Sequence, residues 1–337
     1  MLEWKDEFQM MSGLKQRPNV DPYVQQMIAG TNGRTYIDLI NRLSRYPIPH
    51  LPVSNSAGGI FLDIGCGWGR WMVGAARRGY IPIGVDIKLE AALASLQVLR
   101  DFGVPGYAVV ADLQSLPFAA ESFDFVWSFS VIQHAHRERA ASCVKDIARV
   151  LKPGADCKLE FPIRTGLWNR WRHSRRAAEE SDYESWCVRY YTIEELQDLF
   201  VSEFGSFDYQ AHCYFGIGTQ SVDLYFVPWR FKPIVLASLT LTQFSRALPP
   251  LKRMADSIYV SVRKQSGMSP VGSIRRTTAA GETFGLGDFY ALLRCPISGE
   301  PLVVDAARQE LIAVQAGRVY AVHEGVPVLL AGEARRV

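Results

Sequence analysis

Apolar and polar positions alternate along the middle of the chain in a strand–helix rhythm that begins near residue 59. Short apolar runs bounded by glycine or aspartate predict buried strands, and apolar residues three to four positions apart predict helices between them. The predicted strands are Ile60–Ile64, Tyr80–Val85, Tyr107–Val110, Phe123–Phe129 and Asp156–Phe161, and the predicted helices are Trp68–Arg78, Leu89–Phe102 and Arg137–Leu151. Such alternation predicts an α/β fold, a doubly wound Rossmann-like parallel sheet with helices on both faces.

The pattern changes on either side of this core. Residues 1–55 have helical spacing from Pro22 to Leu43 and predict an N-terminal helical lid or, equally, a helix packed on the sheet edge. Residues 56–264 form the core domain, in which Thr192 and Glu195 make a capping box and Phe207–Phe215 and Ser257–Val262 are further strands. Residues 216–256 are predicted to be a helical insert over the site, or a structural cover. Residues 265–285 have a linker composition, and 286–337 form a small β-rich tail.

Composition narrows the class of protein. The chain has 337 residues, 48% hydrophobic and 21% charged, and a net charge of +3, which is too small to indicate nucleic-acid binding by itself. The six cysteines have no paired spacing, which favours reduced thiols in a cytoplasmic protein over a disulfide framework or a zinc site. The first residues are charged and unlike a signal peptide, and the longest apolar run is too short to span a membrane.

Candidate chemistry gathers where the predicted strands end. Gly65, Gly67 and Gly69 follow the first strand and precede a helix, a geometry that brings backbone close to a nucleotide. No Lys-Ser or Lys-Thr follows the glycines, and Asp63 before them would repel a pyrophosphate. Asp86 ends the second strand, where a carboxylate accepts ribose hydroxyls, and Asp112 ends the third, where it can accept from an adenine amine. These features together indicate an adenosine that carries a cation.

The segment from about 59 to 162 resembles class I S-adenosylmethionine (SAM)-dependent methyltransferases, closest to the small-molecule subgroup that includes ubiquinone/menaquinone-type enzymes. Five motifs carry the resemblance: Leu62–Gly69, Gly84–Asp86, Ala111–Phe118, Ser122–Val126 and Ile147–Gly154. It implies that SAM is the cofactor and that these residues line its site: Asp63, Gly65, Cys66 and Gly67 at the methionine part, Asp86 and Ile87 at the ribose, Asp112 and Leu113 at the adenine, and Ser128.

The acceptor is expected on the far side of this crevice. Ser128–His134 follows the fourth strand and lacks the Asn-Pro-Pro-Tyr pattern of adenine-N6 and glutamine-N5 methyltransferases. His134 is the candidate general base, although a wall residue is the simpler interpretation, because alignment of a nucleophile with an activated methyl group needs no base. Gln133, Arg164, Arg189 and Tyr190 are the predicted acceptor residues. Arginines and tryptophans between 164 and 176 could grip phosphates and stack rings, or form a solvated basic loop.

The tail resembles the small zinc-ribbon-like activator family that partners tRNA, rRNA and release-factor methyltransferases. Leu292–Leu302 and Arg318–Leu330 carry the resemblance. Ser298 and Ala313 stand where zinc-binding members have cysteines, so we predict no metal here. The resemblance implies a fused activator that docks on the catalytic domain in cis or on a protein partner.

Three functions are therefore weighed. The first is an enzyme that transfers a methyl group from SAM to a small-molecule, sugar or lipid-linked acceptor by in-line displacement. The second is an RNA (tRNA-type) methyltransferase with a fused activator domain, suggested by the tail and the Arg/Trp segment. The third is a non-catalytic regulator that binds a partner.

Overall fold

The computed structural model describes residues 20–31, 36, 39–175, 188–216, 218, 220–266 and 284–337. The predicted linker, 265–285, lies almost wholly outside these residues, as do the side chains of 172–175 and all of 176–187 from the Arg/Trp segment. None of the described helices has the length and apolar character needed to cross a membrane.

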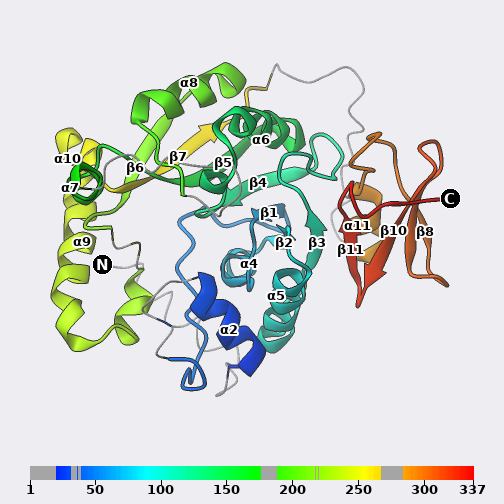
Figure 1. Ribbon diagram of the computed structural model, residues 1–337, viewed down its shortest axis with the longest axis horizontal. Coiled ribbons are helices and arrows are strands. Elements are labelled where there is room, and N and C mark those ends of the chain that lie inside the picture. Colours follow the sequence, from blue (N-terminus) through cyan, green and yellow to red (C-terminus); the bar gives the residue numbers. More distant parts are fainter. Residues whose placement is uncertain are drawn as a thin grey trace.

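The core of the fold is a doubly wound sheet whose strands follow the order β6-β7-β5-β4-β1-β2-β3 (Figure 1). All neighbours are parallel except β7, which is antiparallel to both β5 and β6. The strands are β1 (Ile60–Ile64), β2 (Ile81–Asp86), β3 (Tyr107–Ala111), β4 (Phe123–Ser128), β5 (Leu151–Pro162), β6 (Asp208–Cys213) and β7 (Ser257–Arg263). The predicted fold class is confirmed.

Helices cover both faces of this sheet. On one face lie α2 (Pro22–Thr31), α4 (Arg70–Arg77) and α5 (Leu89–Phe102), and on the other lie η1 (Ile132–His134), α6 (Arg137–Val150) and α8 (Ile193–Phe204). Leu62 and Ile64 of β1 point into the α6 side of the core, and Phe61 points toward α4. The N-terminal segment packs on α4 and α5, where Tyr46 stacks on Trp68 of the glycine turn. The N-terminal segment therefore packs against the glycine turn on the side of α4 and α5.

Some predicted boundaries were wrong. Helix α6 ends at Val150, not Leu151, and β5 begins at Leu151 rather than Asp156. The longer strand includes Pro153 and Gly154, and the β4–β5 register shifts there, between the pairs Phe123–Leu151 and Phe125–Asp156. The helix after the glycines begins at Arg70, and β6 is shorter than predicted. The capping box of Thr192 and Glu195 is confirmed, with Thr192 Oγ1 accepting from the Glu195 N–H at 3.1 Å.

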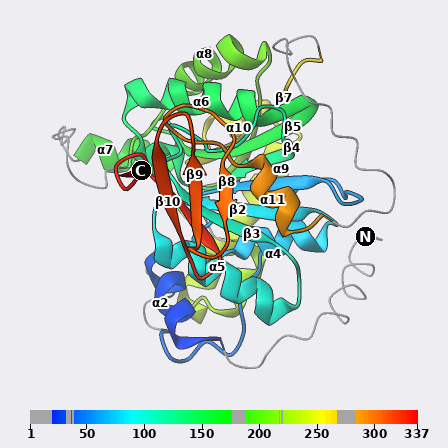
Figure 2. The same ribbon diagram turned by 90° about the vertical axis from the view of Figure 1, so that its right-hand side faces the viewer.

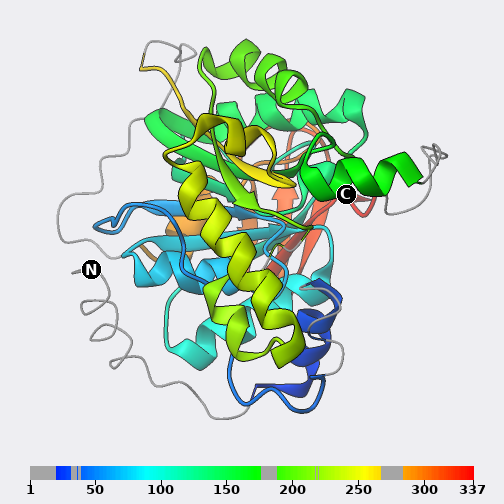
Figure 3. The same ribbon diagram turned by 90° about the vertical axis from the view of Figure 1, so that its left-hand side faces the viewer.

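The insert between β6 and β7 is helical. It consists of η2 (Ser221–Tyr225), η3 (Trp229–Phe231), α9 (Lys232–Ser245) and α10 (Pro249–Arg253). Figure 3 shows α9 crossing the front of the molecule, beside β6 and at the opposite end from the C-terminal strands. Before the insert, α7 (Leu167–Arg175) is capped by Asp256, whose Oδ1 accepts from the N–H groups of Trp168 and Asn169, both at 2.8 Å.

The C-terminal segment extends the main sheet. Its strand β11 (Val326–Leu329) pairs in parallel with β3, and β10, β9 and β8 follow outward (Figure 2). Residues 112–122, between β3 and β4, contain no helix, and α11 (Leu286–Leu292) covers the sheet beside β3 instead. The Phe289 ring stacks on Tyr107 of β3 at 4.7 Å. The remaining elements are β8 (Val303–Asp305), β9 (Glu310–Ala313), β10 (Arg318–His323) and β12 (Arg335–Arg336).

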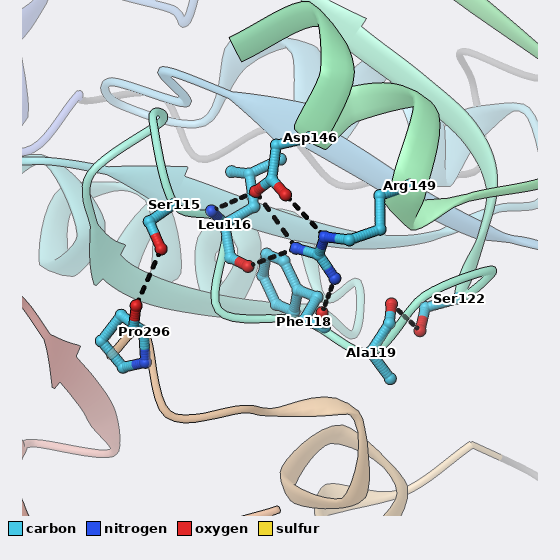
Figure 4. Close-up of polar contacts among 8 residues, drawn as sticks. All are labelled: Ser115, Leu116, Phe118, Ala119, Ser122, Asp146, Arg149 and Pro296. Carbon is cyan, nitrogen blue, oxygen red and sulfur yellow. Dashed lines mark hydrogen bonds and ion pairs between the residues drawn. The ribbon is translucent and has the colours of Figure 1, made fainter. Parts of the chain in front are cut away.

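The loop between β3 and β4 is the platform for this contact (Figure 4). The Arg149 guanidinium donates to the carbonyls of Phe118 at 2.6 Å and Leu116 at 2.8 Å, and Asp146 holds the same guanidinium. From this fixed loop Ser115 Oγ donates to the Pro296 carbonyl at 3.0 Å. The Arg149 motif of the sequence therefore shapes the surface on which the C-terminal segment rests.

Candidate active site

The glycine turn is tight and its amides are already used. Gly65, Gly67 and Gly69 have φ of 71°, 51° and 84°, a region that side chains rarely adopt. A Cβ on Gly65 would lie 2.2 Å from Val131 Cγ2. The N–H groups of Gly65 and Cys66 donate to the Val85 carbonyl, at 2.7 and 3.1 Å. The glycines still allow a ligand to approach the backbone closely. Because these amides already donate to β2, however, the turn is poorly suited to bind an anion.

Asp63 is the most unusual side chain of the site. It is 1% exposed, and neither carboxylate oxygen has a hydrogen-bond partner among the described residues. Burial raises the pKa of Asp63 to about 8; nearby Arg70 opposes the rise and Asp86 adds to it. A buried carboxylate without donors is costly to the folded chain unless a ligand supplies them. Asp63 therefore fits a cationic, hydrogen-bond-donating group.

Two further carboxylates lie at the ends of the next two strands. Asp86 accepts from the Gly67 N–H at 3.0 Å through Oδ2 and from the Lys88 N–H at 3.1 Å through Oδ1, and burial raises its pKa. Ile87 beside it is exposed. Asp112 accepts from the Gln114 N–H at 2.9 Å, and Leu113 packs against the core. The parallel topology thus brings Asp63, Asp86 and Asp112 to one edge.

Cys66 and Ser128 use their side chains within the core. The Cys66 thiol is buried, and a Cβ on Gly84 would lie 2.8 Å from its sulfur. Ser128 Oγ donates to the Ile64 carbonyl at 3.1 Å. Both side chains join β1 to its neighbours, so only the backbone of these residues is available to line a ligand.

The predicted acceptor residues fall into two groups. Gln133 is buried, with Oε1 lacking a partner among the described residues, and His134 is half-buried in η1. Arg189 braces both, since its N–H donates to the Gln133 carbonyl at 3.0 Å and its Nη1 to the His134 carbonyl at 2.9 Å. Arg164 and Tyr190 instead face the start of α8: Arg164 lies 3.9 Å from Glu195 Oε1, and the Tyr190 carbonyl accepts from Arg137.

A buried polar cluster beside this edge was missed by the sequence analysis. Glu160 of β5 is 5% exposed and accepts from Ser130 Oγ at 2.6 Å; burial raises its pKa. His212 lies near the end of β6, and the centre of its ring is 4.6 Å from that of the Tyr259 ring. We call Arg70, Ser130, Glu160, His212 and Tyr259 the polar cluster. The signal was present in Lys158-Leu159-Glu160-Phe161, whose alternation puts polar side chains on one face of a buried strand.

His212 and Arg70 give the cluster its chemical character. His212 is 7% exposed and its Nε2 has no hydrogen-bond partner in the described part of the chain. Burial, with Arg70 and Lys158 nearby, lowers the pKa of His212 to about 3, so its ring is neutral near pH 7 and can accept a hydrogen bond. The half-buried Arg70 guanidinium lies 4.9 Å from the centre of the Phe129 ring. A cation, a carboxylate and a free acceptor together suit a polar ligand.

Comparison with known proteins identifies the central segment. The family model described as "Methyltransferase domain" matches residues 62–157. The O-methyltransferase resE of Aspergillus sclerotiorum is 35% identical over 107 residues, 31% of this chain and 39% of that protein. The chain carries a SAM-dependent methyltransferase domain. Its cofactor is SAM, with which the orphaned Asp63 carboxylate and the glycine turn are compatible.

Two other similarities complete the comparison. A UPF0434 protein of Saccharophagus degradans is 47% identical over 45 residues, which is 13% of this chain and 71% of that protein, so the chain also contains a UPF0434 segment. Phosphoethanolamine N-methyltransferase 2 of Haemonchus contortus, solved in complex with SAM, superposes with a TM-score of 0.43 at 18% identity, covering 72% of this chain and 56% of that one. The chain described here matches less than half of the length of resE.

Proposed function

We propose that this protein transfers a methyl group from SAM to a small polar acceptor, which can be a free molecule, a sugar or a lipid-linked group. The polar cluster carries this proposal. Its residues Glu160, His212 and Tyr259 are buried, it lies beside the carboxyl ends of the strands next to Asp63, and His212 Nε2 in it has no partner among the described residues. Such a set of groups suits an acceptor with a few polar atoms held in a largely enclosed site.

On this proposal Asp63 pairs with the amine of the methionine part, and the turn of Gly65, Cys66 and Gly67 lies against the same part. Asp86 and Ile87 line the ribose, Asp112 and Leu113 line the adenine, and the Ser128 backbone borders the site. When bound, the cofactor supplies a methyl group already activated as a sulfonium. The residues of this chain then have to hold the acceptor in line and exclude water.

Two groups of residues are proposed to bind the acceptor. Glu160 and His212 accept hydrogen bonds from the acceptor, and Arg70 neutralises negative charge on it. Gln133 and His134, braced by Arg189, close the site from the β4 side, with Arg164 and Tyr190 at its rim. His134 as general base stays a prediction; the lowered pKa of His212 suits it to accept a hydrogen bond and makes it a weak base.

The experiment is turnover of a panel of small hydroxylated, carboxylated and amino compounds, followed through release of S-adenosylhomocysteine. Glu160→Gln is expected to lower kcat/KM at least tenfold while leaving S-adenosylhomocysteine affinity within twofold, and Asp86→Ala to weaken that affinity about tenfold or more. Glu138→Gln, an exposed carboxylate on α6, is the control. If Glu160→Gln turns over normally, the cluster does not hold the acceptor.

RNA is the second candidate acceptor. Trp168 and Trp171 on α7 lie 4.6 Å apart, both exposed, with Arg170 between them in sequence. Exposed aromatics beside arginine can stack bases. RNA affinity that falls with salt and is lost in Trp168→Ala would favour this function, and absence of affinity at moderate salt would exclude it.

We propose further that the C-terminal segment is a fused counterpart of the activator family that it resembles. Its parallel pairing with β3 and the packing of α11 on Tyr107 support a cis role, in which the segment covers a sheet face that the chain otherwise leaves without a helix. On this view it stabilises the catalytic domain and does not contact the methyl group.

A further inference from the structure

The helix α9 has apolar residues on both its inner and its outer face. Toward the sheet, Val235 is buried and Leu241 packs against the core. Hydroxyl groups share this inner face: Ser238 Oγ accepts from the Tyr214 N–H at 2.9 Å, and Thr242 Oγ1, which donates to the Ser238 carbonyl at 2.9 Å, lies 3.3 Å from the His212 carbonyl. Its outer face carries Leu236 and Phe244, both more than half exposed. A surface helix ordinarily buries its apolar stripe and exposes its polar one. Here Leu236 and Phe244 have little cover from the described residues.

Neighbouring parts of the insert add to the same surface. Trp229 of η3 is 82% exposed, and Tyr225, Phe231 and Leu248 are also at least half exposed. Figure 3 shows α9 and the 3-10 turns before it on one side of the molecule. We call these six residues, Tyr225, Trp229, Phe231, Leu236, Phe244 and Leu248, the insert surface. Large apolar side chains exposed on α9 and on η2 and η3, which both contact it, favour an interaction site, because covering them would remove apolar area from water.

Charge limits what can cover the insert surface. Residues 224–255 contain five basic residues and no Asp or Glu. The basic residues are Arg230, Lys232, Arg246, Lys252 and Arg253. None of them makes an ion pair with a carboxylate in the described part of the chain. An anionic partner would therefore meet cations that no carboxylate of the described residues neutralises, next to side chains that prefer an apolar medium; one of them, Arg230, stacks on the Phe231 ring.

We propose that the insert surface docks on an anionic membrane, with Trp229, Leu236 and Phe244 entering the headgroup–acyl boundary and the basic residues pairing with lipid headgroups. Tryptophan and phenylalanine beside lysine and arginine are the composition of helices that lie in that boundary. Aliphatic Leu236 and Leu248 cannot stack on bases, which disfavours RNA as the occupant. A second copy of this chain would bring five cations against five cations, which is repulsive.

The position of the surface gives it a function. Because α9 rests directly on β6, through Thr242 and the carbonyl of His212, docking would place the polar cluster close to the membrane. An acceptor carried on a lipid could then enter without leaving the bilayer surface. This last step rests on the proposed function, but vesicle binding can be measured without turnover, so the two can fail separately.

The test uses the full chain and sedimentation with vesicles. Phosphatidylcholine mixed with phosphatidylglycerol is expected to bind the protein, phosphatidylcholine alone is not, and added salt should weaken binding. Arg230→Gln with Lys232→Gln should lower the partition coefficient about 25-fold, at about fivefold for each cation. Trp229→Ser with Leu236→Ser should lower it about tenfold or more. Ile297→Ser with Val314→Ser, exposed apolar residues of the C-terminal segment, is the matched control and should change nothing.

A second readout locates the contact. Brominated lipid should quench part of the tryptophan fluorescence of the wild type and less of it in Trp229→Phe. Unchanged affinity for S-adenosylhomocysteine shows that each variant is folded. The proposal is overturned by absence of vesicle binding at low salt, by equal binding to neutral vesicles, or by a concentration-dependent dimer that the Trp229/Leu236 variant dissociates while vesicles do not bind.

Discussion

The isosteric change Asp63→Asn should make the ligand-free protein more stable and its cofactor binding weaker. In the folded state burial raises the pKa of Asp63 from 3.8 to about 8, so the folded chain holds a proton that the unfolded chain has lost. Between about pH 4 and pH 8 the folded state therefore binds more protons, and the contribution of Asp63 to stability falls as pH rises. Between pH 6 and pH 8 the loss integrates to about 2 kcal/mol.

The assay is urea unfolding of wild type and Asp63→Asn at pH 6 and pH 8 without cofactor. An asparagine cannot ionise, so the variant should gain about 2 kcal/mol on the wild type between the two pH values. Glu138→Gln, an exposed carboxylate, should show no such gain. A wild-type-to-variant difference that is the same at both pH values would refute the assignment of a buried, proton-holding Asp63.

Cofactor binding gives an independent measure of the same carboxyl. A cation beside Asp63 favours its charged form, so binding at pH 7 should release about 0.9 proton from Asp63, less the 0.1–0.2 that the ligand amine takes up. Calorimetry of S-adenosylhomocysteine in two buffers of different ionisation enthalpy measures the net release. Binding without buffer dependence would contradict the pairing. Asp63→Asn should bind about tenfold or more weakly and release no proton.

Two further predictions concern stability. Phe289→Ala removes a fully buried ring stacked on Tyr107 and should lower the free energy of unfolding, measured in urea, by about 3–5 kcal/mol. The control Val314→Ala, on the exposed surface, should lower it by less than about 0.5 kcal/mol. Equal small effects would show that α11 is not part of the core. Thr192→Ala breaks the capping box at the start of α8 and should lower stability by about 1 kcal/mol, with Thr192→Ser retaining most of it; a loss in Thr192→Ser as large as in Thr192→Ala would assign the effect to the methyl group.

The elements that the sequence predicted well are those fixed by interactions between near neighbours. Leu89–Phe102 was predicted with the bounds that the structure gives, because its apolar spacing and the following Gly103 in a left-handed conformation define both ends locally. The glycine turn was also predicted, because Gly65, Gly67 and Gly69 each adopt a positive φ that side chains rarely allow. The sequence also predicted that Asp63, Asp86 and Asp112 lie close together. Each follows or ends a strand, and parallel strands have their carboxyl ends at the same edge of the sheet.

The residues that the sequence analysis did not find depend on contacts between distant segments. Glu160, His212 and Arg70 come from three elements, and each by itself is an ordinary polar residue in an apolar context. Only the burial that the insert and β7 impose turns them into a cluster. In the same way, the sequence predicted a helical insert but not which of its apolar residues are buried: Val235 of α9 packs inward, whereas Leu236 and Phe244 are exposed.

The sequence by itself determined the methyl-donor half of this protein. Its strand–turn–helix pattern and three carboxylates are local features, and local geometry together with the parallel order of the strands suffices to place them. The tertiary structure decided the rest. It joined β11 to β3, the edge strand of the core sheet, and it left Leu236 and Phe244 of the insert exposed. Such pairings are chosen by which edges and faces remain uncovered once the core has formed, and no short stretch of sequence encodes that.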